Sequence, residues 1–434
     1  MQAVIMAGGK GTRLASVTKN EVPKPLVPVL DKPLLERQIE VLKDNGIADI
    51  CIVIGFLGDK IRERLGDGSA YNVKINYIEE NEPLGTAGSF YYLKDFINED
   101  DFLLVFGDVL FDVDISRMAA SHTANNSLAT LFVHPNSHPF DSDLVSLDSD
   151  GRILGFDSKH NERNYWYDNC VNAGLYILDK GLCNLVKEPV KTDLEKDILF
   201  PLIQKGERIY GYKSPEYIKD IGTVERIRSA ETDLQRGFIE KRCLKNKQKC
   251  IFLDRDGTVN VLKGLLYKES DFELEETVVE AIKKINSSEW LCIVVTNQPV
   301  VARGMCSESD VDNIHKKMST LLGRESAWLD GVYFCPHHPD KGYPEENPAY
   351  KIKCRCRKPD TGMVEAAAEK YNIDLQHSWI VGDTTLDIQT GVNAGLHTAL
   401  VLTGEAGKDG KFPATPEITG RSLVEIVNKI IGEN

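Results

Sequence analysis

Short apolar runs alternate along the chain with longer amphipathic stretches. Apolar runs of this length favour buried strands, and apolar residues spaced three or four apart favour helices. In the first half, the predicted strands are residues 3–7, 50–55, 73–79 and 102–108, with a helix over 34–46. In the second half, the predicted strands are residues 250–254, 290–297, 331–335, 378–383 and 398–404, with helices over 278–286, 311–323 and 363–372. Such alternation predicts an α/β protein with parallel strands joined by helical crossovers.

A charged stretch separates the two halves. Residues 239–248 are rich in lysine and arginine and lack strand periodicity, which is typical of a linker, and they follow a predicted helix over 224–236. A chain of 434 residues is long enough for two domains that each bury a core. We therefore predict a first domain over 1–238, a linker over 239–248 and a second domain over 249–434.

The charge balance bears on the kind of partner. Lysine and arginine total 52 and aspartate and glutamate 66, which gives a net charge of −14. This charge repels phosphate backbones and anionic lipid, so nucleic acid and membrane surfaces are poor candidates and small molecules are favoured. No apolar run approaches the roughly 20 residues that span a bilayer, and no secretory signal is visible, so we expect a cytoplasmic protein. Its ten cysteines are then expected to be buried thiols or metal ligands, and its oligomeric state is open.

A glycine-rich turn follows the first predicted strand. It contains Gly8, Gly9, Gly11, Thr12 and Arg13. Glycines let the main chain approach a phosphate with its N–H groups turned inward, and Arg13 can hold two phosphate oxygens at once. Lys24 lies between two prolines, whose stiff backbone would hold a cation in place. Taken singly, the turn is as well explained by an ordinary loop, and Lys24 by a surface charge.

Together, the strings GGKGTRL at 8–14 and PKP at 23–25 resemble the signature of the sugar-1-phosphate nucleotidyltransferases. Further matches follow in that family's order, namely PLGTAG at 83–88, GD at 107–108, NAGLY at 172–176 and KDIGT at 219–223. The resemblance covers residues 1–237 and implies a Rossmann-like, three-layer domain of the GT-A type. In such enzymes a sugar 1-phosphate attacks the α-phosphorus of a nucleoside triphosphate, and pyrophosphate leaves.

The resemblance also implies roles for individual residues. Arg13 and Lys24 would be catalytic by neutralising the triphosphate, and Asp108 and Asp220 would hold Mg²⁺. The turn glycines and Thr12 would bind the nucleotide together with Gly85, Thr86 and Ala87, and the sugar phosphate would contact Lys159, Asn172 and Gly174. Ser158 stands where the family has a glutamate that binds sugar hydroxyls, so the identity of the sugar substrate is open.

The second half opens on the string CIFLDRDGT at 250–258. Its two acids, Asp254 and Asp256, follow a buried strand and flank one pocket, where one can attack phosphorus and the other can protonate the leaving oxygen. Thr296 and Asn297 end a second strand, Lys358 precedes a proline, and Asp383 ends a third strand, with Asp387 four residues on. A capped turn with unrelated acids is the alternative explanation of the first string.

This order of motifs resembles the haloacid-dehalogenase-type phosphatases, which implies a second Rossmann-like, three-layer domain. By that resemblance, Asp254 forms the aspartyl-phosphate and Asp256 is the acid and base. Asp383 would hold Mg²⁺ with Asp254 and the main chain of Asp256. Thr296 and Asn297 would hold the phosphate, and Lys358 would offset the negative charge.

Four further residues have the spacing of zinc ligands. Cys335 and His337 precede Cys354 and Cys356 by a loop, and three cysteines and a histidine in this pattern suit a closed tetrahedral zinc site. Such a structural Zn²⁺ would fix the loop that delivers Arg357 and Lys358 to the phosphate. Scattered buried cysteines are the alternative.

The full motif set is similar to the zinc-containing heptose-bisphosphate phosphatases, with histidinol-phosphate phosphatases as relatives. After the string TNQ at 296–298, Pro299 and Val300 replace the Ser-Gly that is usual in the family, so the substrate contacts of that loop are open. Asn297 and Arg303 are candidates for such contacts, and an exposed polar loop is the alternative explanation of both residues. Such a phosphatase yields heptose 1-phosphate, which a heptose-1-phosphate guanylyltransferase would consume with GTP. The expected substrates are therefore heptose 1,7-bisphosphate, heptose 1-phosphate and GTP. The rival assigns mannose 1-phosphate or another sugar to the transferase and a histidinol-phosphate-type activity to the phosphatase.

Overall fold

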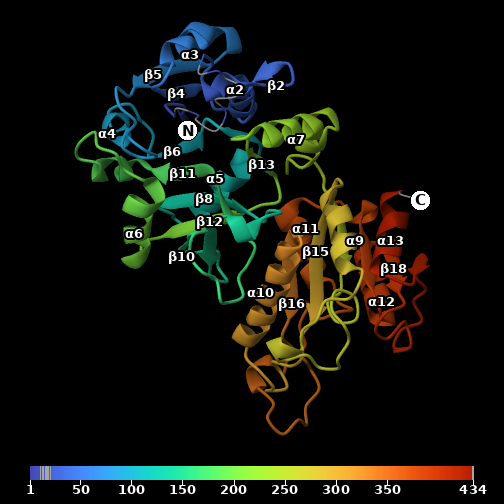
Figure 1. Ribbon diagram of the computed structural model, residues 1–434. Coiled ribbons are helices and arrows are strands. Elements are labelled where there is room, and N and C mark those ends of the chain that lie inside the picture. The colour runs from blue at the N-terminus through green and yellow to red at the C-terminus, as the bar shows by residue number, and fades with distance from the viewer. Residues whose placement is uncertain (10, 12–13, 15–18, 20, 433–434) are drawn as a thin grey trace. The chain divides into compact units, whose positions relative to one another are not determined.

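The computed structural model describes residues 1–9, 11, 14, 19 and 21–432, and the chain forms two compact units (Figure 1). The first unit contains Met1–His134, Asp143–Asp157 and Val171–Cys243, and the second contains the chain from Leu244 onward. Two segments of the first half, Pro135–Ser142 and Ser158–Cys170, also belong to the second unit, which the sequence does not reveal. A short helix, α8 (Phe238–Lys241), overlaps the start of the predicted linker.

The first unit is built on a nine-stranded mixed sheet in the order β10-β9-β11-β6-β1-β4-β5, with β8 paired to β11 and β12 paired to β8. The strands are β1 (Gln2–Met6), β4 (Asp49–Ile54), β5 (Lys74–Glu79), β6 (Asp101–Phe106), β8 (Ala129–His134), β9 (Leu144–Leu147), β10 (Ile153–Asp157), β11 (Val171–Asp179) and β12 (Ile209–Lys213). The predicted parallel pairing is correct for β1, β4, β5 and β6. β11 is not among the strands that the sequence predicts, and it runs antiparallel to β6, β8 and β9.

The central strand of this sheet is buried because other strands flank both of its edges and both of its faces are covered. β1 lies between β4 and β6, and Ala3 and Ile5 join an apolar core with α2 (Leu34–Asp44) and α5 (Ile115–Ala124). The other α-helices among the described residues of this unit are α3 (Gly58–Leu65), α4 (Phe90–Leu93), α6 (Phe200–Gln204) and α7 (Val224–Gln235), in addition to α8. A small ribbon pairs β7 (Val109–Asp112) with β13 (Tyr217–Asp220).

The second unit contains a six-stranded parallel sheet in the order β16-β15-β14-β17-β18-β19 (yellow to red in Figure 1). The strands are β14 (Lys249–Leu253), β15 (Trp290–Asn297), β16 (Gly331–Cys335), β17 (Trp379–Gly382), β18 (His397–Val401) and β19 (Ile418–Gly420). The helices are α9 (Val278–Asn286), α10 (Glu308–Arg324), α11 (Gly362–Tyr371), α12 (Thr385–Ala394) and α13 (Leu423–Ile431). Every strand and helix predicted for this half is present.

Alternate residues of the central strands enter two separate cores. Ile251 and Leu253 pack with α9, α10 and α13, whereas Cys250 and Phe252 pack with α11. A strand that is apolar on both sides must be covered on both faces, which explains why the sequence reads as an unbroken apolar run. The predicted three-layer α/β architecture is therefore confirmed.

The segment Ser158–Cys170 of the first half contacts α10 within the second unit. Thr320 Oγ1 accepts from the Tyr167 backbone N–H and donates to the Tyr167 carbonyl, each at 2.9 Å. Lys317 and Arg324 lie 5.4 and 5.6 Å from the ring of Trp166.

In the part of the chain that the structure describes, no helix has the length and apolar character to cross a membrane.

Candidate active sites

A pocket of about 380 Å³ lies where β1, β5 and β6 of the first unit end. In α/β sheets this edge is where ligands bind, because loops and helix N-termini converge there. The lining residues are Met6, Ala7, Gly8, Gly9, Gly11, Lys24, Pro25, Glu80, Pro83, Gly85, Thr86, Phe106, Gly107, Asp108 and Gly222. The pocket thus brings together residues from five of the segments that the sequence singles out.

Lys24 places a positive charge between two carboxylates in this pocket. Its ammonium lies 2.5 Å from Asp108 Oδ2 and 3.9 Å from Asp220 Oδ1. Arg226, which the sequence does not single out, is hydrogen-bonded to Asp220 Oδ2. Asp220 Oδ1 is buried and has no hydrogen-bond partner among the described residues. Two carboxylates facing one space, one with an unpartnered oxygen, fit the oxygen ligands that Mg²⁺ prefers.

Two glycines allow the close approaches that shape the pocket. Gly11 has a φ of +58°, and a Cβ there would lie 2.9 Å from the Cβ of Lys24. Gly85 has a φ of +79°, and a Cβ there would lie 2.5 Å from the Thr192 carbonyl oxygen. A side chain at either position would strain the backbone and push its neighbour away.

Glu80 is a pocket residue that sequence reasoning missed. It follows β5 directly, lies beside Gly8 and is 9% exposed. Burial raises the pKa of Glu80, against a backbone hydrogen bond from Leu84 that lowers it. Its Oε1 is buried without a hydrogen-bond partner in the described part of the chain. Its position after a predicted strand is the signal that could have found it.

The predicted sugar-phosphate residues are not all in this pocket. Lys159 belongs to the second unit, where it faces Asp141 at 3.5 Å, and it is not among the residues that line the pocket. Asn172 donates to Tyr176 Oη at 2.7 Å and to Glu195 Oε1 at 3.0 Å. Gly174 lies against the ring of Phe106, a pocket residue. Thr12 and Arg13 lie outside the described residues, and Ala87 is buried behind the pocket loop.

In the second unit, Asp254 directly follows β14 and meets a buried lysine. Lys358 Nζ donates to Asp254 Oδ1 at 2.7 Å, to Asp387 Oδ1 at 2.5 Å and to the Val295 carbonyl at 3.0 Å. Burial alone would lower the pKa of Lys358, but the ion pairs with Asp254 and Asp387 raise it. Lys358 is therefore a fixed positive charge, and Asp387 is part of the site.

Asp383 completes a cluster of three carboxylates with Asp254 and Asp387, whose oxygens lie within 4.8 Å of one another. Burial raises the pKa of Asp254 to about 7, with Lys358 opposing and Asp387 adding to the shift. Burial and the charge of Asp254 raise the pKa of Asp383 to about 8. Asp383 Oδ1 is buried without a hydrogen bond from any described residue, and a Cβ on Gly404 would lie 2.1 Å from Asp383 Oδ2. These donors fit a divalent cation such as Mg²⁺.

Asp256 faces the same strand edge but its side chain stands outside the carboxylate cluster. Asp256 Oδ2 accepts from Gln298 Nε2 at 2.7 Å, and Arg255 donates to both carboxylate oxygens. Only a main-chain contribution of Asp256 to a metal is thus compatible with this arrangement. The hydroxyl of Thr296 accepts from Gln298 at 2.9 Å.

The loop around Lys358 is held by Asn297. Its amide oxygen accepts from the Lys358 backbone N–H at 3.0 Å, and its nitrogen donates to the Lys358 carbonyl at 3.2 Å. Arg357 donates to the His337 carbonyl at 3.1 Å. Arg303 lies over the ring of Tyr343, with 4.4 Å between the guanidinium carbon and the ring centroid.

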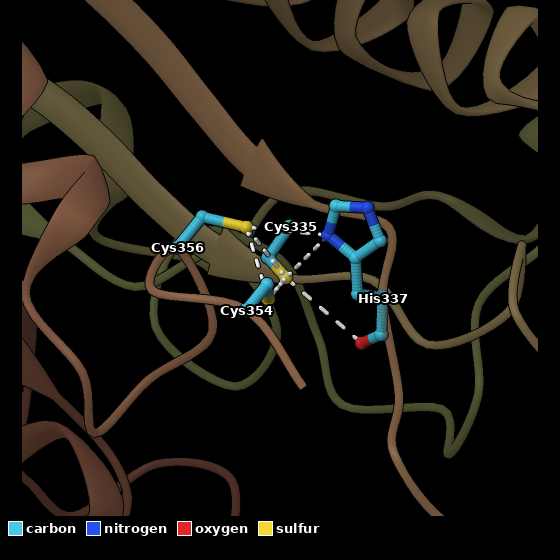
Figure 2. Close-up of side chains that lie close together, drawn as sticks. All are labelled: Cys335, His337, Cys354 and Cys356. Atoms are coloured by element: carbon cyan, nitrogen blue, oxygen red, sulfur yellow. Dashed lines mark hydrogen bonds between the residues drawn. The ribbon is translucent and has the colours of Figure 1, made fainter. Parts of the chain in front are cut away.

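The four predicted zinc ligands come together (Figure 2). The three sulfurs of Cys335, Cys354 and Cys356 are 3.2–3.5 Å apart, and His337 Nδ1 lies 3.3 Å from the Cys356 sulfur. None of the ten cysteines, all of which lie among the described residues, is in a disulfide. Burial, followed by the neighbouring Cys356, raises the pKa of Cys335, which means that a cation is needed to stabilise the thiolate. Three sulfurs and one imidazole nitrogen fit a tetrahedral metal site of the kind that Zn²⁺ occupies.

Comparison with known proteins supports both enzyme classes. Residues 2–237 match the family model "Nucleotidyl transferase", and residues 355–426 match "HAD-hydrolase-like". The chain is 38% identical over 183 residues to a D-glycero-beta-D-manno-heptose-1,7-bisphosphate 7-phosphatase of Haemophilus ducreyi, covering 42% of this chain and 97% of that protein. It is 38% identical over 156 residues to a D-glycero-alpha-D-manno-heptose-1,7-bisphosphate 7-phosphatase of Burkholderia mallei, covering 36% of this chain and 80% of that protein.

The first half also has a characterised relative. A mannose-1-phosphate guanylyltransferase of Mycobacterium tuberculosis is 28% identical over 246 residues, covering 56% of this chain and 67% of that protein. The chain thus joins a nucleotidyltransferase to a phosphatase of the HAD-like class, which makes the protein an enzyme of both classes. The chain belongs to the nucleotidyl transferase family, and its second half belongs to the family of the heptose-bisphosphate 7-phosphatases.

Proposed function

We propose that the protein makes a GDP-heptose in two consecutive steps. The second unit would remove the 7-phosphate of D-glycero-D-manno-heptose 1,7-bisphosphate, and the first would transfer GMP from GTP to the resulting heptose 1-phosphate. The observation that carries this proposal is the presence, in one chain, of a relative of heptose-bisphosphate phosphatases and a sugar-1-phosphate nucleotidyltransferase site. The product of the first reaction is a substrate of the second.

The phosphatase step follows from the placement of Asp254 and Asp256. The Asp254 carboxylate attacks the 7-phosphorus, the bond to the sugar oxygen breaks, and Asp256 gives its proton to that oxygen. Water then attacks the aspartyl-phosphate while Asp256 takes its proton, which releases phosphate and restores Asp254. Lys358 keeps Asp254 ionised, and Thr296 and Asn297 would hold the phosphate. Mg²⁺ held by Asp254, Asp383 and the main chain of Asp256 would supply charge neutralisation at phosphorus.

The transferase step follows from the charges around Lys24. An oxygen of the sugar 1-phosphate attacks the α-phosphorus of GTP, and the bond to the pyrophosphate oxygen breaks. Lys24 and Arg13 would neutralise the triphosphate, and Asp108 and Asp220 would hold Mg²⁺, which supplies charge stabilisation there. The main chain of the turn at 8–14 would bind the nucleotide phosphates, and Lys159, Asn172 and Gly174 remain candidates for the sugar phosphate.

Glu80 supports the choice of GTP. Glu80 lines the nucleotide pocket, and its Oε1 has no hydrogen-bond partner among the described residues, so we infer that its carboxylate would accept from a base with donors. A carboxylate only accepts hydrogen bonds, and guanine offers two adjacent donors, N1–H and the 2-amino group. Adenine presents an acceptor at N1, which would repel the carboxylate. A guanine-specific transferase among the relatives of this half points to the same base.

A structural Zn²⁺ at Cys335, His337, Cys354 and Cys356 is part of the proposal. It would join the end of β16 to the loop that carries Arg357 and Lys358. Without a bridging cation, the three sulfurs would be crowded thiols with little to hold the loop in place.

Base selection offers a sharp test. Pyrophosphate release would be compared with GTP, ITP and ATP, since ITP keeps N1–H but lacks the 2-amino group. The wild type should prefer GTP over ITP by about 5- to 100-fold, because one hydrogen bond to a charged group contributes about 1–3 kcal/mol. Glu80→Ala should lose most of this preference, whereas the exposed Glu79→Ala should keep it. Equal use of GTP and ATP by the wild type would exclude a GTP-specific site.

The relative from Mycobacterium favours one alternative, a mannose-1-phosphate guanylyltransferase. Parallel assays with heptose 1-phosphate, in both anomers, and mannose 1-phosphate decide between the two. We expect the larger kcat/KM with one heptose anomer. A larger kcat/KM with mannose 1-phosphate would replace heptose in the proposal and leave the base assignment intact.

A further inference from the structure

The acid and base Asp256 is surrounded by donors that the motif assignments leave without a role. Arg255 Nη2 donates to Oδ1 at 2.9 Å and to Oδ2 at 3.0 Å. Gln298 Nε2 donates to Oδ2 at 2.7 Å, and Asn260 Nδ2 donates to Oδ1 at 3.1 Å. Donors therefore reach both carboxylate oxygens from three different side chains, which leaves the Asp256 carboxylate a single orientation.

These donors are buried, although the carboxylate they hold is partly open. Arg255 and Asn260 are 0% exposed and Gln298 is 1% exposed, whereas the Asp256 side chain keeps 21% of its surface accessible. A buried guanidinium is costly unless its donors are satisfied, so its placement beside Asp256 is strongly determined. The exposed part of Asp256 is then the part that can meet a substrate.

A histidine of α10 holds the far side of Arg255. His315 Nε2 lies 3.2 Å from Arg255 Nη1, and the ring packs at 5.3 Å from Phe334. A guanidinium can only donate, so Nε2 accepts and carries no proton in this contact. His315 is 6% exposed and has Arg255 as its hydrogen-bonded charged neighbour. It therefore fixes the guanidinium plane that Asp256 meets.

We propose that Arg255 and Gln298, backed by His315, are positioning residues for proton transfer to the leaving group. This inference rests on the proposed phosphatase step, in which Asp256 protonates the sugar oxygen as the bond from phosphorus breaks. A carboxyl group free to rotate would spend much of its time turned away from that oxygen. Small displacements of a catalytic group cost large factors in rate, so residues that prevent rotation act on kcat and spare KM.

The dependence on the leaving group separates this role from a merely structural one. An alkoxide is a strong base and needs a proton to leave, whereas nitrophenolate leaves without one. In Gln298→Ala, the single-turnover rate with heptose 1,7-bisphosphate should fall about 10- to 100-fold, with KM within about threefold of wild type. The nitrophenolate burst from p-nitrophenyl phosphate, which reports the first step alone, should stay within about threefold.

Matched variants complete the experiment. His315→Gln keeps an acceptor near Nε2 and should retain most of the single-turnover rate with the bisphosphate, whereas His315→Leu should lose it as Gln298→Ala does. Gln376→Ala, at an exposed glutamine, should match wild type with both substrates. Thermal unfolding and zinc content would verify that each variant is folded.

Each result has a defined meaning. An equal loss with both substrates in folded Gln298→Ala, or no loss with either, would overturn the positioning role while the phosphatase assignment stands. A wild-type protein that gives neither phosphate nor a nitrophenolate burst would overturn the phosphatase assignment, and the inference with it.

Discussion

Lys358 is the residue whose removal tests the phosphatase site most sharply. Its ammonium bridges Asp254 and Asp387 at 2.7 and 2.5 Å, and its side chain is 2% exposed. Methionine has nearly the same length and fits the same space, so Lys358→Met removes the charge and leaves the packing largely intact. The carboxylate cluster would then have no positive charge from this side.

The size of the effect follows from the burial of the pair. Breaking a buried ion pair by removing one partner costs about 3–5 kcal/mol, and 1.36 kcal/mol corresponds to one pKa unit. The pKa of Asp254, already about 7, would rise by about 2–4 units if the cost fell on its ionised form. At neutral pH the nucleophile would be mostly protonated, so phosphate release should slow about 10²- to 10³-fold.

The assay is phosphate release from heptose 1,7-bisphosphate near pH 7. Lys353→Met, at an exposed lysine five residues away in the same loop, should behave as wild type. Pyrophosphate release in the transferase assay with added heptose 1-phosphate should be unchanged in Lys358→Met, which shows that the chain is folded and active. A phosphatase rate within about threefold of wild type would refute the claim that Lys358 keeps Asp254 ionised.

Three further predictions concern the metals and the first unit. Burial raises the pKa of Asp254 to about 7 and that of Asp383 to about 8. Between about pH 4 and pH 8 these carboxyl groups therefore keep protons in the folded protein that they have lost in the unfolded chain. Without magnesium, the second unit should thus lose stability as the pH rises from about 4 to about 8. Added Mg²⁺ should raise the Tm more at pH 8 than at pH 6, and a constant increment would contradict this. Cys354→Ser should reduce bound zinc from about one per chain to none, measured by elemental analysis, and destabilise the second unit, whereas Cys306→Ser should keep the metal. Asp108→Asn should slow pyrophosphate release about 10²-fold and leave phosphate release unchanged, and equal losses in both assays would indicate misfolding instead.

The parts of the fold that the sequence predicts are those set by local pattern. The run at 250–254 is apolar on both faces because each face packs on helices, so its length and composition are enough to identify the strand. β11 is different. Its antiparallel pairing with β6 depends on which strands lie beside it in the sheet, and nothing in its own residues specifies that direction.

The same distinction holds for the sites. The clustering of Cys335, His337, Cys354 and Cys356 could be predicted because their spacing alone is typical of metal ligands. Glu80 is one acid among many in the sequence and becomes distinctive only through burial beside Gly8.

Contacts between residues distant in the chain are also hidden from sequence reasoning. Arg255 and His315 are 60 positions apart, and a buried pair of this kind carries no local signature. Thr320 and Tyr167 are 153 positions apart, and their hydrogen bonds bring a segment of the first half into the second unit. The loop with Lys159 belongs to that segment, and no pattern in the sequence of the first half signals that its residues pack with the second unit.

The central claim is that one chain performs two consecutive reactions, and a product analysis by ³¹P NMR tests it directly. Incubation with heptose 1,7-bisphosphate, GTP and Mg²⁺ should yield GDP-heptose, phosphate and pyrophosphate in equal amounts. Asp254→Asn should abolish phosphate release, and adding heptose 1-phosphate should restore GDP-heptose. Phosphate release without any GDP-sugar, from wild-type protein that has consumed the bisphosphate, would contradict the account.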